Sequence, residues 1–195
     1  MNDVTRTPDG RKWTYLDLVT ASDETLERIL RAGRPPDARQ LAGWEFKGYN
    51  SLDLTAFLGF RKFKKGFYSE RTPTHAGERI KGYNVKVRQN GVTEPWEPLI
   101  SGGHPVRHGF YDAYPVDPGE KDNLYPNALL INYDCGRNPI YDPSRFLRDY
   151  LVQVDPENPD LYLGKATIAI GPWRPAVSYF VLERHNQPEP GARLP

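Results

Sequence analysis

Residues 41–50, "LAGWEFKGYN", decide how the fold is interpreted, because their last four letters return as "KGYN" at 81–84. The second copy lies in "ERIKGYNVKVRQNG", which alternates like a strand and has no helical period, and no third copy follows. A phosphate-binding loop has several glycines before a helix, often followed by Lys-Ser/Thr, and neither copy has this pattern. The pair instead predicts two strands in which Gly48 and Gly82 mark a bulge or a sharp bend, as a barrel wall requires.

The composition is typical of one turn-rich β domain. The chain has 195 residues, enough for one domain with a real core and short for two. Its 19 prolines and 17 glycines separate short segments, and its 12 tyrosines favour strands. A formal net charge of +1 creates no overall field toward nucleic acid or an anionic membrane, so we do not expect a nucleic-acid partner.

The cysteine count and the N-terminal sequence indicate the cellular compartment of the protein. A single cysteine, Cys135, excludes an intramolecular disulfide framework, and it is a nucleophile only if its thiolate is stabilised, with Arg137 nearby in sequence. The first residues, "MNDVTRTPDGRKW", lack the apolar core of a signal peptide, and no run approaches the roughly 20 apolar residues of a membrane span. We therefore expect a cytoplasmic protein without a transmembrane segment.

Two segments have helical signals. In "SDETLERILRAG", Ser22 is a candidate N-cap, acidic residues occupy the first turn, and Gly33 is the stop. In "SLDLTAFLGFRKFKKG" (51–66), apolar residues recur at intervals of three and four before Gly66. The second segment predicts a short helix lying over an opening.

The rest of the chain predicts strands separated by turns. The expected strands cover residues 43–49, 65–69, 79–89, 106–114, 127–134, 146–154, 160–170 and 177–185. In the last of them both alternating faces are apolar, which in an open sheet requires covering layers on both sides. Two helical segments are too few for that, so the sequence predicts a mainly β fold with a single closed antiparallel barrel.

These expectations give one domain over 1–186, with a helical lead-in at 1–40 and the barrel at 41–186. The tail at 187–195, rich in proline and polar residues, is expected to be disordered.

With a barrel predicted, its first and last strands carry a resemblance. "GW" at 43–44 begins the first strand, and the last strand ends "FVLER" at Arg184. This resembles the calycin barrels, lipocalins and fatty-acid-binding proteins, in which Gly-x-Trp starts the first strand and a late arginine packs across that tryptophan, although here Trp44 follows glycine directly. "GWEFKG" and "KFKKGFY" also resemble small bacterial Gly-x-Trp-x-Gly barrel proteins of unknown function. The resemblance implies a barrel plugged at one end by Trp44 and Arg184, with an apolar, lipocalin-like cavity reached from the other end.

Acid-base chemistry has one candidate segment, "GGHPVRHGFYDAY", which contains His108, Asp112 and Tyr114. On a regular strand these three share a face, but His108 and Asp112 then stand roughly 13 Å apart, too far for a dyad. A carboxylate from another strand, with Asp134 and Glu183 as the available residues, would be needed. This segment motivates one alternative function, a cofactor-free isomerase, cyclase or dehydratase.

No metal site is expected, because the histidines are scattered. Only His104 and His108 stand four apart, a spacing that suits a helix rather than a strand containing Pro105 and Gly109. Haem needs a single axial ligand, for which His108 or His185 could serve, but otherwise no cofactor is expected.

The favoured function is binding or carrying a small hydrophobic, lipid-like molecule in the barrel cavity. Arg61 or Lys65 is the expected entrance cation for an acidic head group, and His108 is the expected interior anchor. The remaining expected cavity, core or plug residues are Trp44, Phe67, Tyr83, Phe110, Tyr111, Tyr179, Phe180 and Arg184. A third alternative is an interaction module for nucleic acid or a membrane surface through "FRKFKKGFY" (60–68), where cations and aromatic rings alternate. The sequence does not fix the oligomeric state.

Overall fold

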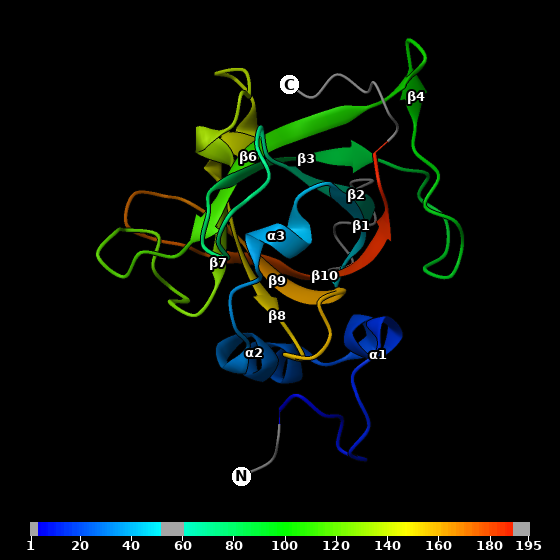
Figure 1. Ribbon diagram of the computed structural model, residues 1–195, viewed down its shortest axis with the longest axis vertical. Helices are drawn as coiled ribbons and strands as arrows, with labels where there is room; N and C mark the ends of the chain where they lie inside the picture. Colours follow the sequence, from blue (N-terminus) through cyan, green and yellow to red (C-terminus); the bar gives the residue numbers. More distant parts are fainter. Residues whose placement is uncertain (1–3, 52–60, 189–195) are drawn as a thin grey trace.

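Eight strands close into an antiparallel barrel in the computed structural model, which describes residues 4–51 and 61–188 (Figure 1). The barrel strands are β1 (Trp44–Asn50), β2 (Lys62–Tyr68), β3 (Ile80–Lys86), β6 (Arg107–Pro115), β7 (Leu129–Asn132), β8 (Leu147–Gln153), β9 (Leu161–Ile168) and β10 (Ala176–Asn186). Each pairs with the next along the chain, and β10 closes on β1. The remaining strands, β4 (Ile100–Ser101) and β5 (His104–Pro105), form a separate hairpin between β3 and β6. All eight predicted strands are confirmed.

Three helices precede the barrel. They are α1 (Tyr15–Thr20), α2 (Asp23–Ala32) and α3 (Ala38–Leu41), and two short 3-10 helices, η1 (Tyr133–Cys135) and η2 (Pro143–Phe146), join β7 to β8. The predicted caps of α2 are confirmed, since the Ser22 hydroxyl accepts the Thr25 N–H at 3.3 Å and Gly33 is the C-cap. Helix α3, which the sequence did not separate from its surroundings, lies across one end of the barrel (Figure 1).

The second predicted helix is wrong over its last residues, because Lys62–Tyr68 is strand β2. Residues 52–60 of that prediction lie outside the described part of the chain. The error has a physical cause: Phe63 and Phe67 are four apart, which fits a helical face, but they also alternate with Lys64 and Gly66 as strand residues do. The short helix that covers an opening is α3.

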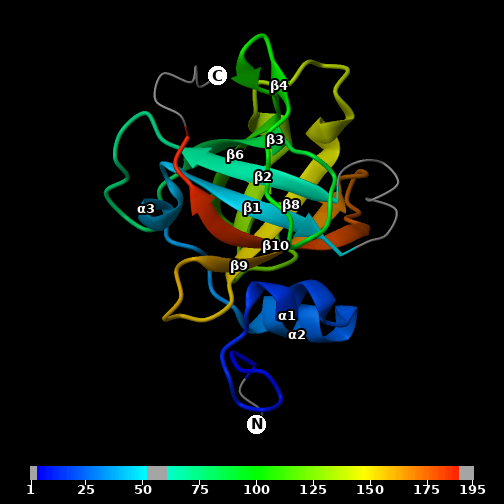
Figure 2. The same ribbon diagram turned by 90° about the vertical axis from the view of Figure 1, so that its right-hand side faces the viewer.

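The two apolar faces of β10 are buried in different cores. Phe180 and Leu182 lie in the cluster inside the barrel, whereas Tyr179 and Val181 lie in an outer cluster with Leu26 of α2. Helices α1 and α2 pack against the outside of β9 and β10 (Figures 1 and 2). The barrel is therefore closed, as predicted, and is also covered on one side by helices.

The two "KGYN" glycines make room for aromatic rings on neighbouring strands. Gly48 pairs directly with Phe63, and Gly82 pairs directly with Tyr111. A Cβ atom at either glycine would overlap the facing ring. The predicted bulge occurs next to Gly82, where the β3–β6 register slips, whereas Gly48 pairs with β2 without irregularity.

Replacing Gly82 by alanine is expected to lower the free energy of unfolding by about 1–3 kcal/mol, because the added methyl group meets the Tyr111 ring and the Gly66 carbonyl. Gly91→Ala is the matched control, since its Cβ would meet only the flexible Glu94 side chain, at 3.4 Å. Urea titration of both variants measures the difference. Equal stability of the two variants would contradict the close approach at Gly82.

Candidate functional site

A buried ion pair lies inside the barrel. The Lys65 ammonium on β2 donates to Asp149 Oδ2 on β8 at 3.1 Å and to the Tyr133 hydroxyl at 2.6 Å. The Tyr133 hydroxyl in turn donates to Asp149 Oδ2 at 3.0 Å. Lys65 is 1% exposed and Asp149 3% exposed. Charged groups this deep are costly unless paired, so the three side chains form one unit, which we call the polar cluster.

Aromatic rings surround the lysine of the polar cluster. Lys65 Nζ lies 4.8 Å from the centroid of the Tyr111 ring, 5.1 Å from that of Tyr133 and 5.3 Å from that of Phe180. Lys65 reaches this position because it lies between Phe63 and Phe67 on the inward face of β2. The rings stabilise the ammonium through their negative faces and exclude water from it.

Burial acts on both charges of the polar cluster. It lowers the pKa of Lys65, against the attraction of Asp149, and it raises the pKa of Asp149, against the attraction of Lys65. Asp149 Oδ1 is buried and has no hydrogen-bond partner among residues 4–51 and 61–188. A buried carboxylate oxygen without a donor is costly, so this atom retains the capacity to accept a hydrogen bond.

A bulge turns His108 toward the barrel interior beside the polar cluster. Gly109 and Phe110 on β6 stand opposite the single residue Tyr83 on β3, and His108 then pairs with Asn84. The Asn84 amide donates to the Tyr133 hydroxyl at 3.3 Å, so the paired residues Asn84 and His108 are adjacent to the polar cluster. The positive φ of Gly109, 53°, accommodates the bulge.

His108 is half-buried, and it is neutral at physiological pH. Burial, followed by the charges of Lys86 and Lys65, lowers its pKa to about 4. Its Nδ1 atom is buried without a hydrogen-bond partner in the described part of the chain. His108 therefore offers a second unsatisfied polar atom on the inward side of β6.

The prediction that Asp112 and Tyr114 share a strand face with His108 is wrong. The bulge shifts the alternation by one residue, so Tyr111 points inward, and Asp112 and Tyr114 point outward. Asp112 binds Arg79 at 3.4 Å, and Tyr114 accepts the Asn132 amide at 2.9 Å. The structure does not bring either of them to His108.

The two carboxylates suggested as partners from other strands also bind elsewhere. Asp134 pairs with Arg145 at 2.8 Å, and Glu183 pairs with Lys47.

The stacking of Arg184 on Trp44 is confirmed. The Arg184 guanidinium carbon lies 4.6 Å from the centroid of the Trp44 ring and 5.4 Å from that of Phe46. Arg184 also pairs with Asp160 and donates to the carbonyl of Gln40, a residue of α3, at 3.0 Å. These contacts fasten the α3 end of the barrel.

The other predicted ligand residues divide between the two faces of the wall. Phe67, Tyr111 and Phe180 lie in the interior cluster, and their rings pack edge to face with neighbouring rings. Three others lie outside the interior cluster: Tyr83 donates to Glu45 at 3.1 Å, Tyr179 donates to Glu27 at 2.7 Å, and Phe110 packs near Tyr83. Arg61 is half-buried, with its guanidinium carbon 5.1 Å from the centroid of the Tyr49 ring.

The lysines of the 60–68 segment are not solvated. Lys65 is the interior cation described above and not an entrance residue. Lys62 is 2% exposed, and its ammonium donates to backbone carbonyls of the β3–β6 connection and lies 3.9 Å from the centroid of the Trp96 ring. Lys64 is buried near Asn186 and Glu45. Their alternation with aromatic residues therefore reflects packing, because these cations are enclosed.

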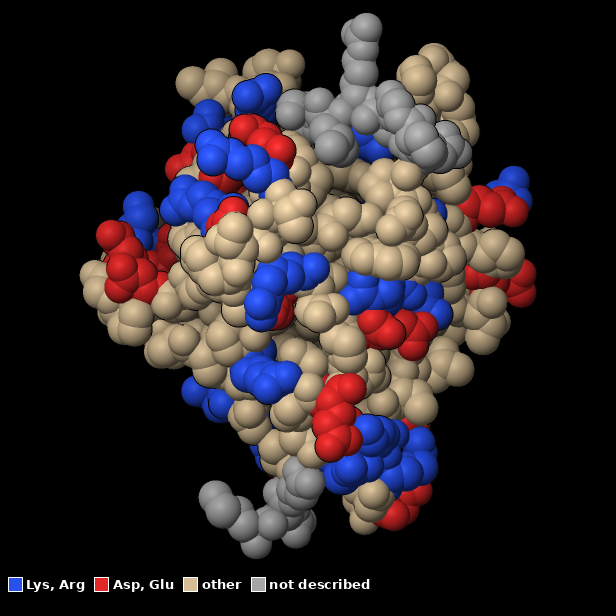
Figure 3. Space-filling model, in the orientation of Figure 1, with Lys and Arg blue, Asp and Glu red and all other residues tan. Residues whose placement is uncertain are grey.

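On the face drawn in Figure 3, basic and acidic side chains are interspersed, so no large area there carries charges of one sign only. Cys135 and His185 are both exposed. Within the described residues, no group of three or more His, Cys, Asp or Glu side chains is placed to hold a metal ion.

A surface groove of about 750 Å³ lies outside the barrel, lined by residues between 4 and 29. Its charged side chains include Arg11, which pairs with Asp17 at 2.8 Å and with Asp9 at 3.0 Å. None of the predicted site residues lines it.

The chain matches no known family model, no curated protein and no solved structure at a significant level. No helix in the described part of the chain is long and apolar enough to span a membrane.

Proposed function

We propose that the protein binds a small, largely apolar molecule in the barrel, with a hydrogen-bond-donating head group directed to Asp149 and His108. The observation that carries the proposal is Asp149 Oδ1, a deeply buried carboxylate oxygen without a partner in the described residues. The acidic head group expected from the sequence is not part of the proposal, because Lys65, one of the two expected entrance cations, is buried and paired with Asp149.

Access to this site is from the end of the barrel opposite α3, which we call the far end. Three interior-facing residues there, Phe63, Leu147 and Val177, are only partly buried. At the α3 end, Arg184 stacks on Trp44 and α3 lies across the barrel, which supports access from the opposite end. The same stacking supports membership of the calycin group, whose barrels hold apolar ligands, and that assignment is part of the proposal.

Native mass spectrometry of the freshly purified protein, beside an organic extract of the same sample, tests the proposal. A retained small molecule is expected, with occupancy lowered in His108→Gln and unchanged in Asp112→Asn, whose side chain faces outward. Protein at its calculated mass, with no organic molecule in the extract, would count against binding. A Soret band in the absorption spectrum would identify the molecule as haem.

Proton transfer is a second candidate, favoured by the neutral state of His108 and its unpartnered Nδ1. Its partners would be Tyr133 and Asp149 rather than Asp112 and Tyr114. If the extracted molecule is returned to the protein and changes mass over time, and His108→Gln stops the change, the site is catalytic. An unchanged molecule identifies a carrier.

A further inference from the structure

Large exposed apolar side chains gather on the connections at the far end. Because the strands alternate in direction, the β3–β6, β7–β8 and β9–β10 connections all lie at that end. In Figure 2, α3 lies at the left of the barrel and the β9–β10 connection, in orange, lies at the right. Six such residues, which we call the apolar rim, lie on or beside two of these connections: Ile140, Tyr141, Phe146, Ile168, Ile170 and Trp173.

The exposure of the apolar rim is high and localised. Ile140 is 87% exposed, Tyr141 86% and Trp173 73%. Leu99 and Ile100, on the third far-end connection, are also exposed. Among the described residues, the only other large apolar side chains this exposed are two leucines elsewhere, Leu16 and Leu124. Scattered apolar residues are ordinary on a protein surface, but a gathering at one end marks a docking surface.

The two connections are held together by direct contacts. The Ala169 N–H donates to the Phe146 carbonyl at 2.7 Å, and Leu147 pairs with Ile168. Ile170 and Trp173 exchange backbone hydrogen bonds of 3.0 and 2.9 Å across a turn at Gly171. These contacts place Phe146, Ile168, Ile170 and Trp173 on adjacent strand ends, and Ile140 and Tyr141 precede Phe146 in the same β7–β8 connection.

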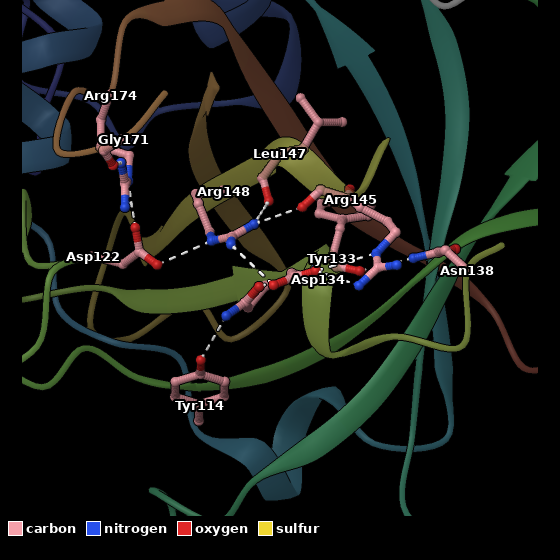
Figure 4. A network of polar contacts seen from close by, with 11 residues as sticks. Tyr114, Asp122, Tyr133, Asp134, Asn138, Arg145, Leu147, Arg148, Gly171 and Arg174 are labelled. Carbon is pink, nitrogen blue, oxygen red and sulfur yellow. Dashed lines mark hydrogen bonds and ion pairs between the residues drawn. The ribbon is translucent and has the colours of Figure 1, made fainter. Parts of the chain in front are cut away.

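A buried charge network fixes the base of this feature (Figure 4). Asp122 binds Arg174 and, at 3.0 Å, Arg148. The Arg174 guanidinium donates to the carbonyls of Gly171 and Trp173 at 2.8 and 2.7 Å, which fixes the turn that carries Trp173. The backbone turn that carries Trp173 is thus fixed, so docking through it orders little additional backbone.

We propose that the apolar rim docks on the surface of an uncharged, zwitterionic lipid bilayer. Tyrosine and tryptophan beside isoleucine and phenylalanine match the composition of residues that enter the bilayer interface. Protein interfaces use arginine as a frequent anchor, but Arg148 and Arg174 are buried and Arg145 is paired with Asp134, which leaves Arg137 as the exposed arginine of these connections. Residues 133–146 and 168–176, together with the buried pair partners Asp122 and Arg148, carry three aspartates and four arginines. The net charge of +1 gives anionic lipid little advantage over zwitterionic lipid.

Co-sedimentation with phosphatidylcholine vesicles tests this proposal. The wild-type protein is expected to bind, and the double variant Ile170→Ser/Trp173→Ser to lose about tenfold in partitioning. The control is Leu16→Ser on α1, which removes an exposed apolar residue from another part of the surface and is expected to bind like wild type. Binding is expected to persist at high salt, because it does not depend on surface charge.

A second readout locates the contact. Brominated phosphatidylcholine is expected to quench the fluorescence of Trp173, and Trp173→Phe should abolish the quenching while the protein still binds. Failure to bind phosphatidylcholine vesicles, or equal loss in the control variant, overturns the proposal. So does binding restricted to anionic vesicles and removed by salt. A dimer in light scattering that the double variant abolishes, without vesicle binding, would assign the rim to a second copy of the chain and also overturn it.

Discussion

Lys65→Met is expected to lower the free energy of unfolding by about 3–5 kcal/mol, the cost of leaving one member of a buried ion pair alone. The substitution removes the cation and one of the two donors of Asp149 Oδ2, leaving only the Tyr133 hydroxyl, while Asp149 Oδ1 already lacks a partner in the described residues. Methionine has nearly the length of lysine and fits among the rings of Tyr111 and Phe180, so the loss reports electrostatics more than a cavity. Chemical denaturation at neutral pH measures it.

The double variant Lys65→Met/Asp149→Leu separates pairing from burial. It removes both charges together, so its loss is expected to be smaller than that of Lys65→Met alone. The control is Lys81→Met, which breaks an exposed pair with Glu70 and is expected to cost about 0–1 kcal/mol. Losses that simply add in the double variant would show that Lys65 and Asp149 are not coupled.

The same double variant tests whether the polar cluster serves binding or stability. An apolar pair at these positions is expected to fold with only a small loss of stability relative to the ion pair, since desolvation opposes the attraction of buried charges. A folded double variant that no longer retains the small molecule would therefore assign the polar cluster to binding rather than to stability.

The strands could be predicted because their signals are local. Turn residues bound each segment, and alternation within β10 revealed two buried faces. The stacking of Arg184 on Trp44 came from a resemblance and not from spacing. Helix α3 was missed because four residues between prolines and a glycine carry too little periodicity to stand out.

The polar cluster was not predicted, because its members come from strands far apart in the sequence. Asp149 is 84 residues from Lys65. One local signal was available, since Asp149 stands in "FLRDYLVQV", where the alternation with Leu147 and Leu151 assigns it to an apolar face. A charge at such a position requires a partner, but the sequence does not say which strand supplies it.

The error at His108 came from the bulge. An extra residue in one strand inverts the facing of everything beyond it, so Asp112 and Tyr114 moved to the outside while His108 remained inside. A glycine such as Gly109 is compatible with a bulge, but only the pairing with β3 reveals that the register slips there.

His108 is expected to make the protein less stable as the pH falls from about 6.5 to about 4. Burial, with the charges of Lys86 and Lys65, lowers its pKa in the folded state to about 4, whereas the unfolded chain takes up a proton near pH 6.5. Between these values the unfolded state binds more protons, so stability decreases by up to about 1.4 kcal/mol per pH unit, or roughly 2–3 kcal/mol at pH 4. Below the folded-state pKa the loss no longer grows.

Comparison of wild type with His108→Gln isolates this contribution, because the other titrating groups act in both proteins. The difference in the free energy of unfolding between the two is expected to shift by roughly 2–3 kcal/mol in favour of the variant between pH 7 and pH 4. His104→Gln, in the exposed β4–β5 hairpin, is the control and should follow wild type at every pH. If His108→Gln also parallels wild type, the imidazole is not held neutral by burial, and a role as an interior hydrogen-bonding anchor loses its electrostatic basis.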